Sequence, residues 1–129
     1  MPVQANPVRI SSAEWEVMEI LWAASPDGLL LSQVLDAMPQ ENSWATKTVQ
    51  TFLKRLVDKG VAETVREGRM LRYSVAVSHA DCIKQEADSF LGRVFQGRVS
   101  HLLAHFIEEE DLNQGDIDDL RRILEEKRK

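Results

Sequence analysis

Apolar residues recur at helical spacing along much of this chain, and the clearest case spans residues 44–60. Its apolar positions follow one another at steps of three and four, the period of a helix with one buried face. They are Val49, Phe52, Leu53, Leu56 and Val57. The opposite face carries hydroxyl, amide and cationic side chains, which suit phosphate oxygens and base edges. This pattern predicts a recognition helix, although a solvated helix can show the same face, so its neighbours must decide.

Two further helices are predicted before this one. Ser11 and Glu14 have the spacing of a capping box, and an apolar helical pattern follows them up to Ser25-Pro26-Asp27-Gly28. A second helix is predicted over 29–38, and the short polar link 40–43 leads from it into the third. Three helices joined in this way indicate a helix-turn-helix core.

A β-hairpin is predicted directly after the third helix. Residues 61–65 and 70–77 are rich in β-branched and aromatic side chains, and Gly68 lies between them. Arg66 and Arg69 would then lie at the tip, which is the layout of a winged helix whose wing follows a phosphate strand or the minor groove. A solvated turn is the competing interpretation of these arginines.

From residue 78 the pattern is helical throughout, with three short amphipathic helices. About 50 residues of this kind rarely form a stable monomeric core, so they predict a dimerisation module. A two-fold dimer would read two half-sites, which predicts a palindromic operator. The apolar residues expected between subunits are Phe90, Leu91, Val94, Leu102, Leu103, Phe106, Ile117, Leu120 and Leu124.

The expected fold is therefore mostly α with a small β-hairpin. It comprises a flexible arm (1–9), a winged helix-turn-helix domain (10–77) and an all-helical dimerisation domain (78–129). The 129 residues carry a net charge of −5, but residues 45–77 hold seven basic and three acidic side chains. Positive charge thus accumulates where the recognition helix and wing are expected, as binding to double-stranded DNA requires.

The predicted DNA-binding residues fall into two groups, with Arg72 completing the set. Lys47, Lys54, Arg55, Arg66 and Arg69 are expected at phosphates. Thr46, Thr48, Gln50 and Thr51 are expected closest to base edges.

Other classes of function have weaker signals. His101 with His105, and His79 with Cys82, have spacings compatible with a metal, but neither pair has a third nearby ligand, so no metal and no cofactor are predicted. A single cysteine excludes a disulfide framework within one chain. Catalytic motifs are missing, so no enzyme is predicted. A metal-responsive or redox-responsive regulator and a protein-binding winged helix remain as alternatives.

The chain is expected to be cytoplasmic. It contains no apolar run near the ~20 residues that a membrane span requires, and no basic and apolar leader at its start. No membrane partner is therefore predicted.

The run Ile10-Ser11-Ser12-Ala13-Glu14-Trp15-Glu16-Val17-Met18 resembles the opening of the BlaI/MecI/CopY penicillinase-repressor family. The likeness covers nearly the whole chain. It continues at Trp44, Lys47-Thr48-Val49, Leu53, Arg55-Leu56, Lys59-Gly60, Arg72-Tyr73-Ser74, Glu110-Asp111-Leu112 and residues 116–121. The resemblance implies a dimeric winged-helix repressor that sits on a palindromic promoter element and is released by an inducing signal.

The resemblance also implies two routes of release. In the β-lactam-responsive branch a regulatory protease cuts before a Phe in the C-terminal module, and the matching bond here is His105-Phe106, with His where relatives carry Asn. In the copper-responsive branch, release depends on Cys-x-Cys motifs near the C-terminus, and this chain has none.

Overall fold

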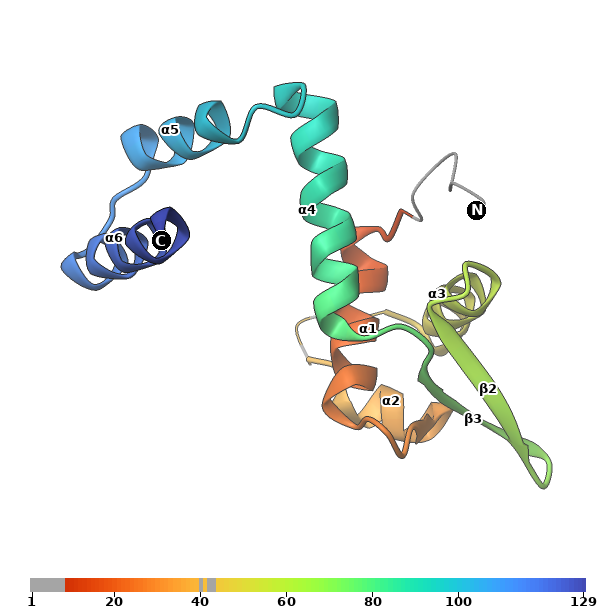
Figure 1. Cartoon of the computed structure of the whole chain (residues 1–129). Helices are drawn as coiled ribbons and strands as arrows, with labels where there is room; N and C mark the ends of the chain where they lie inside the picture. Colours follow the sequence, from red (N-terminus) through yellow and green to blue (C-terminus); the bar gives the residue numbers. More distant parts are fainter. Residues whose placement is uncertain (1–8, 40, 42–43) are drawn as a thin grey trace. The chain divides into compact units, whose positions relative to one another are not determined.

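The computed structural model describes residues 9–39, 41 and 44–129, in two compact units that divide after Ala87 (Figure 1). The predicted arm therefore lies outside the described residues except for Arg9, and the predicted link 40–43 except for Glu41. The described part of the first unit holds three whole helices, three strands and the start of a fourth helix. The whole helices and the strands are α1 (Ser12–Ala23), β1 (Leu29–Leu30), α2 (Leu31–Ala37), α3 (Thr46–Asp58), β2 (Ala62–Glu67) and β3 (Met70–Val75).

The first helix begins at the predicted capping box. The Glu14 backbone amide donates to Ser11 Oγ over 3.1 Å, and the Ser11 amide donates to Glu14 Oε1 over 3.0 Å. These two bonds satisfy amide groups that the start of a helix leaves without partners. The buried faces of the three helices meet in one core. The core residues that these three helices contribute are Val17, Met18, Leu21, Val34, Val49, Leu53 and Leu56.

The prediction of a single helix over 29–38 is wrong at its start. Leu29 and Leu30 form a short strand that pairs antiparallel with β3, giving a three-stranded sheet of order β1-β3-β2. Gly28 explains the break, because its φ of +78° lies in the left-handed region that ends helical structure. The helix begins only at Leu31, where the Gln33 side chain accepts from the Leu30 amide over 2.8 Å.

The C-terminal half is helical, as predicted, with α4 (His79–Phe95), α5 (Val99–Glu109) and α6 (Gln114–Arg128). The predicted domain boundary precedes Ser78, whereas the first turns of α4 pack with the winged-helix unit. Cys82 is fully buried there, and the His79 ring lies 4.6 Å from the Trp22 ring between centroids. Among the described helices, none is long and apolar enough to cross a membrane.

Candidate nucleic-acid interface

Helix α3 presents the polar face that its sequence predicts. Val49, Leu53 and Leu56 are buried, and Phe52 and Val57 pack against the core, so the polar positions of the helix turn outward. Of the predicted contact residues on α3, Thr48 is half-buried and the others are exposed; these are Thr46, Lys47, Gln50, Thr51, Lys54 and Arg55. The face can therefore meet a duplex without unfolding any part of the core.

Two internal contacts modify this face. Thr51 Oγ1 donates to the Lys47 carbonyl over 3.0 Å, which leaves the Thr51 hydroxyl as an acceptor. Lys54 Nζ lies 3.2 Å from Asp58 Oδ2, and both side chains are more than half exposed. An exposed pair one helical turn apart is weak, so Lys54 can exchange Asp58 for a phosphate at little cost.

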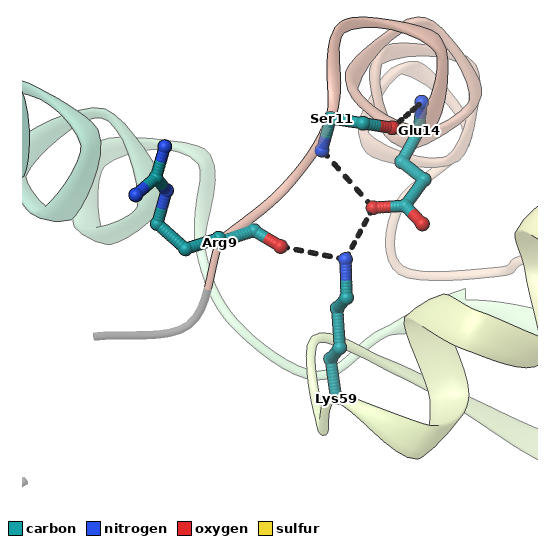
Figure 2. A network of polar contacts seen from close by, with 4 residues as sticks. All are labelled: Arg9, Ser11, Glu14 and Lys59. Carbon is teal, nitrogen blue, oxygen red and sulfur yellow. Dashed lines mark hydrogen bonds and ion pairs between the residues drawn. The ribbon is translucent and has the colours of Figure 1, made fainter. Parts of the chain in front are cut away.

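The C-terminal end of α3 is fixed to the start of α1 by a polar network (Figure 2). Lys59 Nζ donates to Glu14 Oε1 over 2.5 Å and to the Arg9 carbonyl over 2.6 Å. The Glu14 residue is only 2% exposed, and the same carboxylate oxygen accepts from the Ser11 amide. One carboxylate thus caps α1 and anchors α3.

The protonation of Glu14 reflects this network. Burial raises the pKa of the carboxyl, but hydrogen bonds from Lys59 and Ser11, together with the Lys59 charge, outweigh burial and leave the pKa below its usual value. Glu14 is therefore ionised at neutral pH, and its negative charge offsets the positive charge of Lys59. Lys59 therefore holds the end of α3 in place and is not a free cation for a phosphate.

The wing is a two-stranded ribbon that projects beyond the helices of its unit (Figure 1). Strands β2 and β3 pair from Ala62 with Val75 to Glu67 with Met70, and Gly68 and Arg69 form the turn. Both Arg66 and Arg69 are exposed, as predicted for a wing that meets phosphates.

A groove of about 400 Å³ lies between the wing and the helices. Gln50 of α3 lines one side, and Arg69 and Met70 of the wing line another. The sequence pattern places Gln50 and Arg69 on separate elements, and the fold brings them to the same groove. Sequence analysis missed Ser32, which also lines the groove, because the start of α2 depends on the unrecognised strand β1.

The seven basic residues of 45–77 differ in whether they form an ion pair. Three form ion pairs: Lys54 with Asp58, Lys59 with Glu14, and Arg72 with Glu67. Within the described part of the chain, the other four form none, and they are Lys47, Arg55, Arg66 and Arg69. These four lie on α3 and the wing and belong to the set predicted at phosphates.

Arg72 is placed differently from the other predicted DNA-binding residues. Its side chain is 28% exposed and its guanidinium bonds to both carboxylate oxygens of Glu67. The hydrogen bonds from Arg72 lower the pKa of the Glu67 carboxyl, so this carboxyl remains ionised at neutral pH. Sequence analysis gave no role to Glu67, although its position five residues before Arg72 on a predicted hairpin was a usable signal.

Many apolar side chains of the second unit are exposed within one chain. No residue of α5 or α6, both fully described, is buried. In the predicted dimerisation set, Leu91, Leu102, Ile117 and Leu120 are half-buried; the exposed members are Phe90, Val94, Leu103, Phe106 and Leu124. The candidate cleavage bond His105-Phe106 lies inside α5, where the backbone is helical.

The described residues also bear on the metal and redox alternatives. They contain no group of three or more His, Cys, Asp or Glu side chains that could hold a metal ion. His101 and His105 instead lie near the Phe95 ring, at 5.5 and 6.1 Å between centroids. Burial raises the pKa of the Cys82 thiol, with smaller contributions from Asp81 and Glu86, so the reactive thiolate is disfavoured.

Comparison with known proteins decides the family. The model of the penicillinase repressor family matches residues 10–126. The chain belongs to the penicillinase repressor family. This confirms the resemblance drawn from the sequence, and because the family consists of transcriptional repressors, it also confirms the prediction of a non-enzymatic protein.

Curated relatives in this family match almost end to end. The methicillin resistance regulatory protein MecI of Mammaliicoccus sciuri is 32% identical over 118 residues, covering 92% of this chain and 94% of MecI. The penicillinase repressor of Bacillus licheniformis is 34% identical over 118 residues, covering 92% and 91%.

A solved structure supports the winged-helix fold. The DNA-binding domain of the repressor BlaI is 31% identical and has a TM-score of 0.51, covering 60% of this chain and 93% of that domain. The predicted winged helix-turn-helix is therefore confirmed.

Proposed function

We propose that this chain is a sequence-specific DNA-binding repressor that acts as a homodimer on a palindromic promoter element. Helix α3 enters the major groove, and the β2–β3 wing follows the adjacent backbone. The observation that carries the proposal is that four of the seven basic residues of 45–77, all on these two elements, form no ion pair among the residues that the structure describes. Family membership adds support, because the Bacillus licheniformis relative is named as a penicillinase repressor and MecI as a regulatory protein.

Side-chain chemistry decides which residues contact phosphates and which contact base edges. Lys47, Arg55, Arg66 and Arg69 neutralise phosphates, and Lys54 joins them by releasing Asp58. The base edges are met by Thr46, Thr48, Gln50 and Thr51. The side chains of Thr46, Thr48 and Gln50 can donate and accept, whereas the Thr51 hydroxyl, which donates to the Lys47 carbonyl, accepts. Gln50, which shares a groove with Arg69, is the residue with the longest reach among the four.

Dimerisation supplies the second half-site. The exposed apolar residues of α4, α5 and α6 would be covered by the same residues of a second copy, as a two-fold interface requires. An inducing signal that separates the subunits would then release the DNA. A regulatory protease cutting at His105-Phe106 would do so by removing the end of α5 and all of α6.

Selection from a random duplex library, followed by titration at several salt concentrations, tests the proposal. A repressor should select a palindromic sequence, and log affinity should fall against log salt by about 0.9 for each neutralised phosphate. A protein-binding winged helix, the alternative, would select no sequence and show no such slope. Loss of DNA affinity only after thiol oxidation or metal addition would favour the redox or metal alternative.

A further inference from the structure

The Arg72 side chain lies where all three strands of the sheet come together. On β3, Arg72 is the register partner of Leu30 in β1 and of Val65 in β2. A side chain at this position can reach both the turn that precedes β1 and the far end of β2.

Its guanidinium does reach both. Nε donates to Glu67 Oε2 over 2.6 Å, and Nη2 donates to Glu67 Oε1 over 3.0 Å, a two-pronged pairing. Nη1 donates to the Gly28 carbonyl over 3.2 Å. Glu67 is the last residue of β2, directly before the turn of the wing, whereas Gly28 is the residue before β1. One planar group therefore joins the outer end of the wing to its base.

The Gly28 end of this connection is rigid. Gly28 is buried with a φ of +78°, and a Cβ built on it would lie 2.5 Å from the Tyr73 carbonyl oxygen. The backbone before β1 thus lies directly against β3, at a distance that only glycine allows. The carbonyl that accepts from Arg72 is held by packing and not by a mobile loop.

We propose that Glu67, Arg72 and Gly28 form a clamp that sets the orientation of the wing relative to α3. Arg72 is then a positioning residue: it acts on DNA through Arg66 and Arg69, the exposed cations of the wing, of which Arg69 lines the groove. The inference rests on the proposed function, since the wing is taken to meet phosphates. It differs from that proposal in giving Arg72 no phosphate of its own.

Substitution of Glu67 distinguishes the clamp from an effect of charge alone, because the two predict opposite changes in DNA affinity. It is an exposed carboxylate on a wing that should approach phosphates, so Coulomb repulsion alone predicts that Glu67→Gln strengthens DNA binding. The clamp predicts the opposite sign, because an amide cannot hold both prongs of the guanidinium as a carboxylate does.

The test uses the full chain and a labelled duplex that the wild-type protein has selected from a random library. Affinities are measured by fluorescence anisotropy at several salt concentrations for E67Q, R72K, R72Q and E67Q/R72Q. Glu63→Gln is the matched control, because Glu63 is an exposed carboxylate of β2 that pairs with no cation within the described residues.

The clamp predicts that E67Q binds about twofold to fivefold more weakly, the range of an exposed ion pair. R72K should lose as much affinity as R72Q, since lysine keeps the charge but not the fork. R72Q should keep the wild-type salt slope, and the double variant should be no weaker than R72Q. E63Q should bind as tightly as wild type or more tightly.

Three outcomes would overturn the clamp: an E67Q variant that binds as tightly as E63Q, an R72K variant with wild-type affinity, or an R72Q slope reduced by about 0.9, the mark of a phosphate contact. Amide hydrogen exchange across β1 and β3 in the free protein gives an independent reading. Faster exchange in E67Q and R72K than in E63Q supports the clamp, and unchanged exchange overturns it. Failure of the wild type to select any duplex overturns the proposed function instead.

Discussion

Lys59, at the end of α3, donates to the buried carboxylate of Glu14, in the first turn of α1 and 45 residues earlier in the chain. The proposed recognition helix α3 is thus fixed at its C-terminal end by a residue that also caps α1. Removing one partner of a buried pair leaves the other without compensation. The stability of this fold should therefore depend on the charge of Glu14.

Glu14→Gln should destabilise the protein by about 1–3 kcal/mol at pH 7, less than for a fully buried pair because Lys59 is partly exposed. The pKa of Glu14 is lowered in the folded protein, so its contribution is complete above the unfolded value of about 4.3. It is lost as pH falls through the folded pKa. Urea unfolding of wild type and variant should show a difference that shrinks on acidification, whereas E63Q should match wild type throughout.

Some features of this region could be predicted from the sequence and others could not, for physical reasons. The Ser11 and Glu14 cap depends on local spacing, and the structure has it as predicted. The pairing of Glu14 with Lys59 joins residues far apart in the chain, and no periodicity reports such a contact. Strand β1 was missed because two leucines fit a helix as well as a strand, and only the pairing with β3 decides.

In the candidate interface, too, locally determined features could be predicted and contacts between distant residues could not. The exposed face of α3 could be predicted because a period of 3.6 fixes which residues turn outward. The period of 3.6 does not apply to the hairpin, where the sequence placed Arg66 and Arg69 at the tip but gave no contact to Arg72. Arg72 is set apart by its bonds to Glu67, for which the spacing on the hairpin was a usable signal, and to the Gly28 carbonyl, which tertiary structure brings within reach.

Substitutions on α3 should separate sequence reading from backbone contact. Gln50→Ala and Thr51→Ala should each cost roughly 1–3 kcal/mol on the selected duplex and little on a scrambled one. Arg55→Ala should weaken both duplexes and reduce the salt slope by about 0.9. Gln85→Ala, at an exposed glutamine of α4, is the control and should change neither. The recognition-helix assignment fails if all three variants on α3 behave like the control.

Cys82 should behave as a core residue and not as a sensor. Burial raises the pKa of its thiol, and the side chain is 1% exposed. The folded protein should therefore react slowly with a disulfide reagent at pH 8, and the urea-unfolded protein should react at the rate of a free cysteine. Rapid reaction of the folded protein would instead favour the redox alternative.

Truncations should locate the end of the DNA-binding unit. A chain ending at Val77 loses the buried Cys82 side chain and the tilted contact of the His79 ring with Trp22, whereas a chain ending at Ala87 keeps both. The shorter chain should melt several degrees lower, since each 1 kcal/mol shifts Tm by about 4–8 °C in a domain of this size. Equal melting temperatures would instead support the predicted boundary before Ser78.

The exposed apolar residues of α5 and α6 should hold the dimer together. Leu103 and Leu124 are 38% and 57% exposed within one chain, so Leu103→Asp and Leu124→Asp remove little from its own core. Each should shift the protein toward monomer in sedimentation, because a charge buried between subunits is costly, and should weaken binding to the selected palindrome. Val65→Asp, at a 61% exposed wing residue, should leave the oligomeric state unchanged. If both leucine variants sediment as the wild type does, the dimer must be built on other residues.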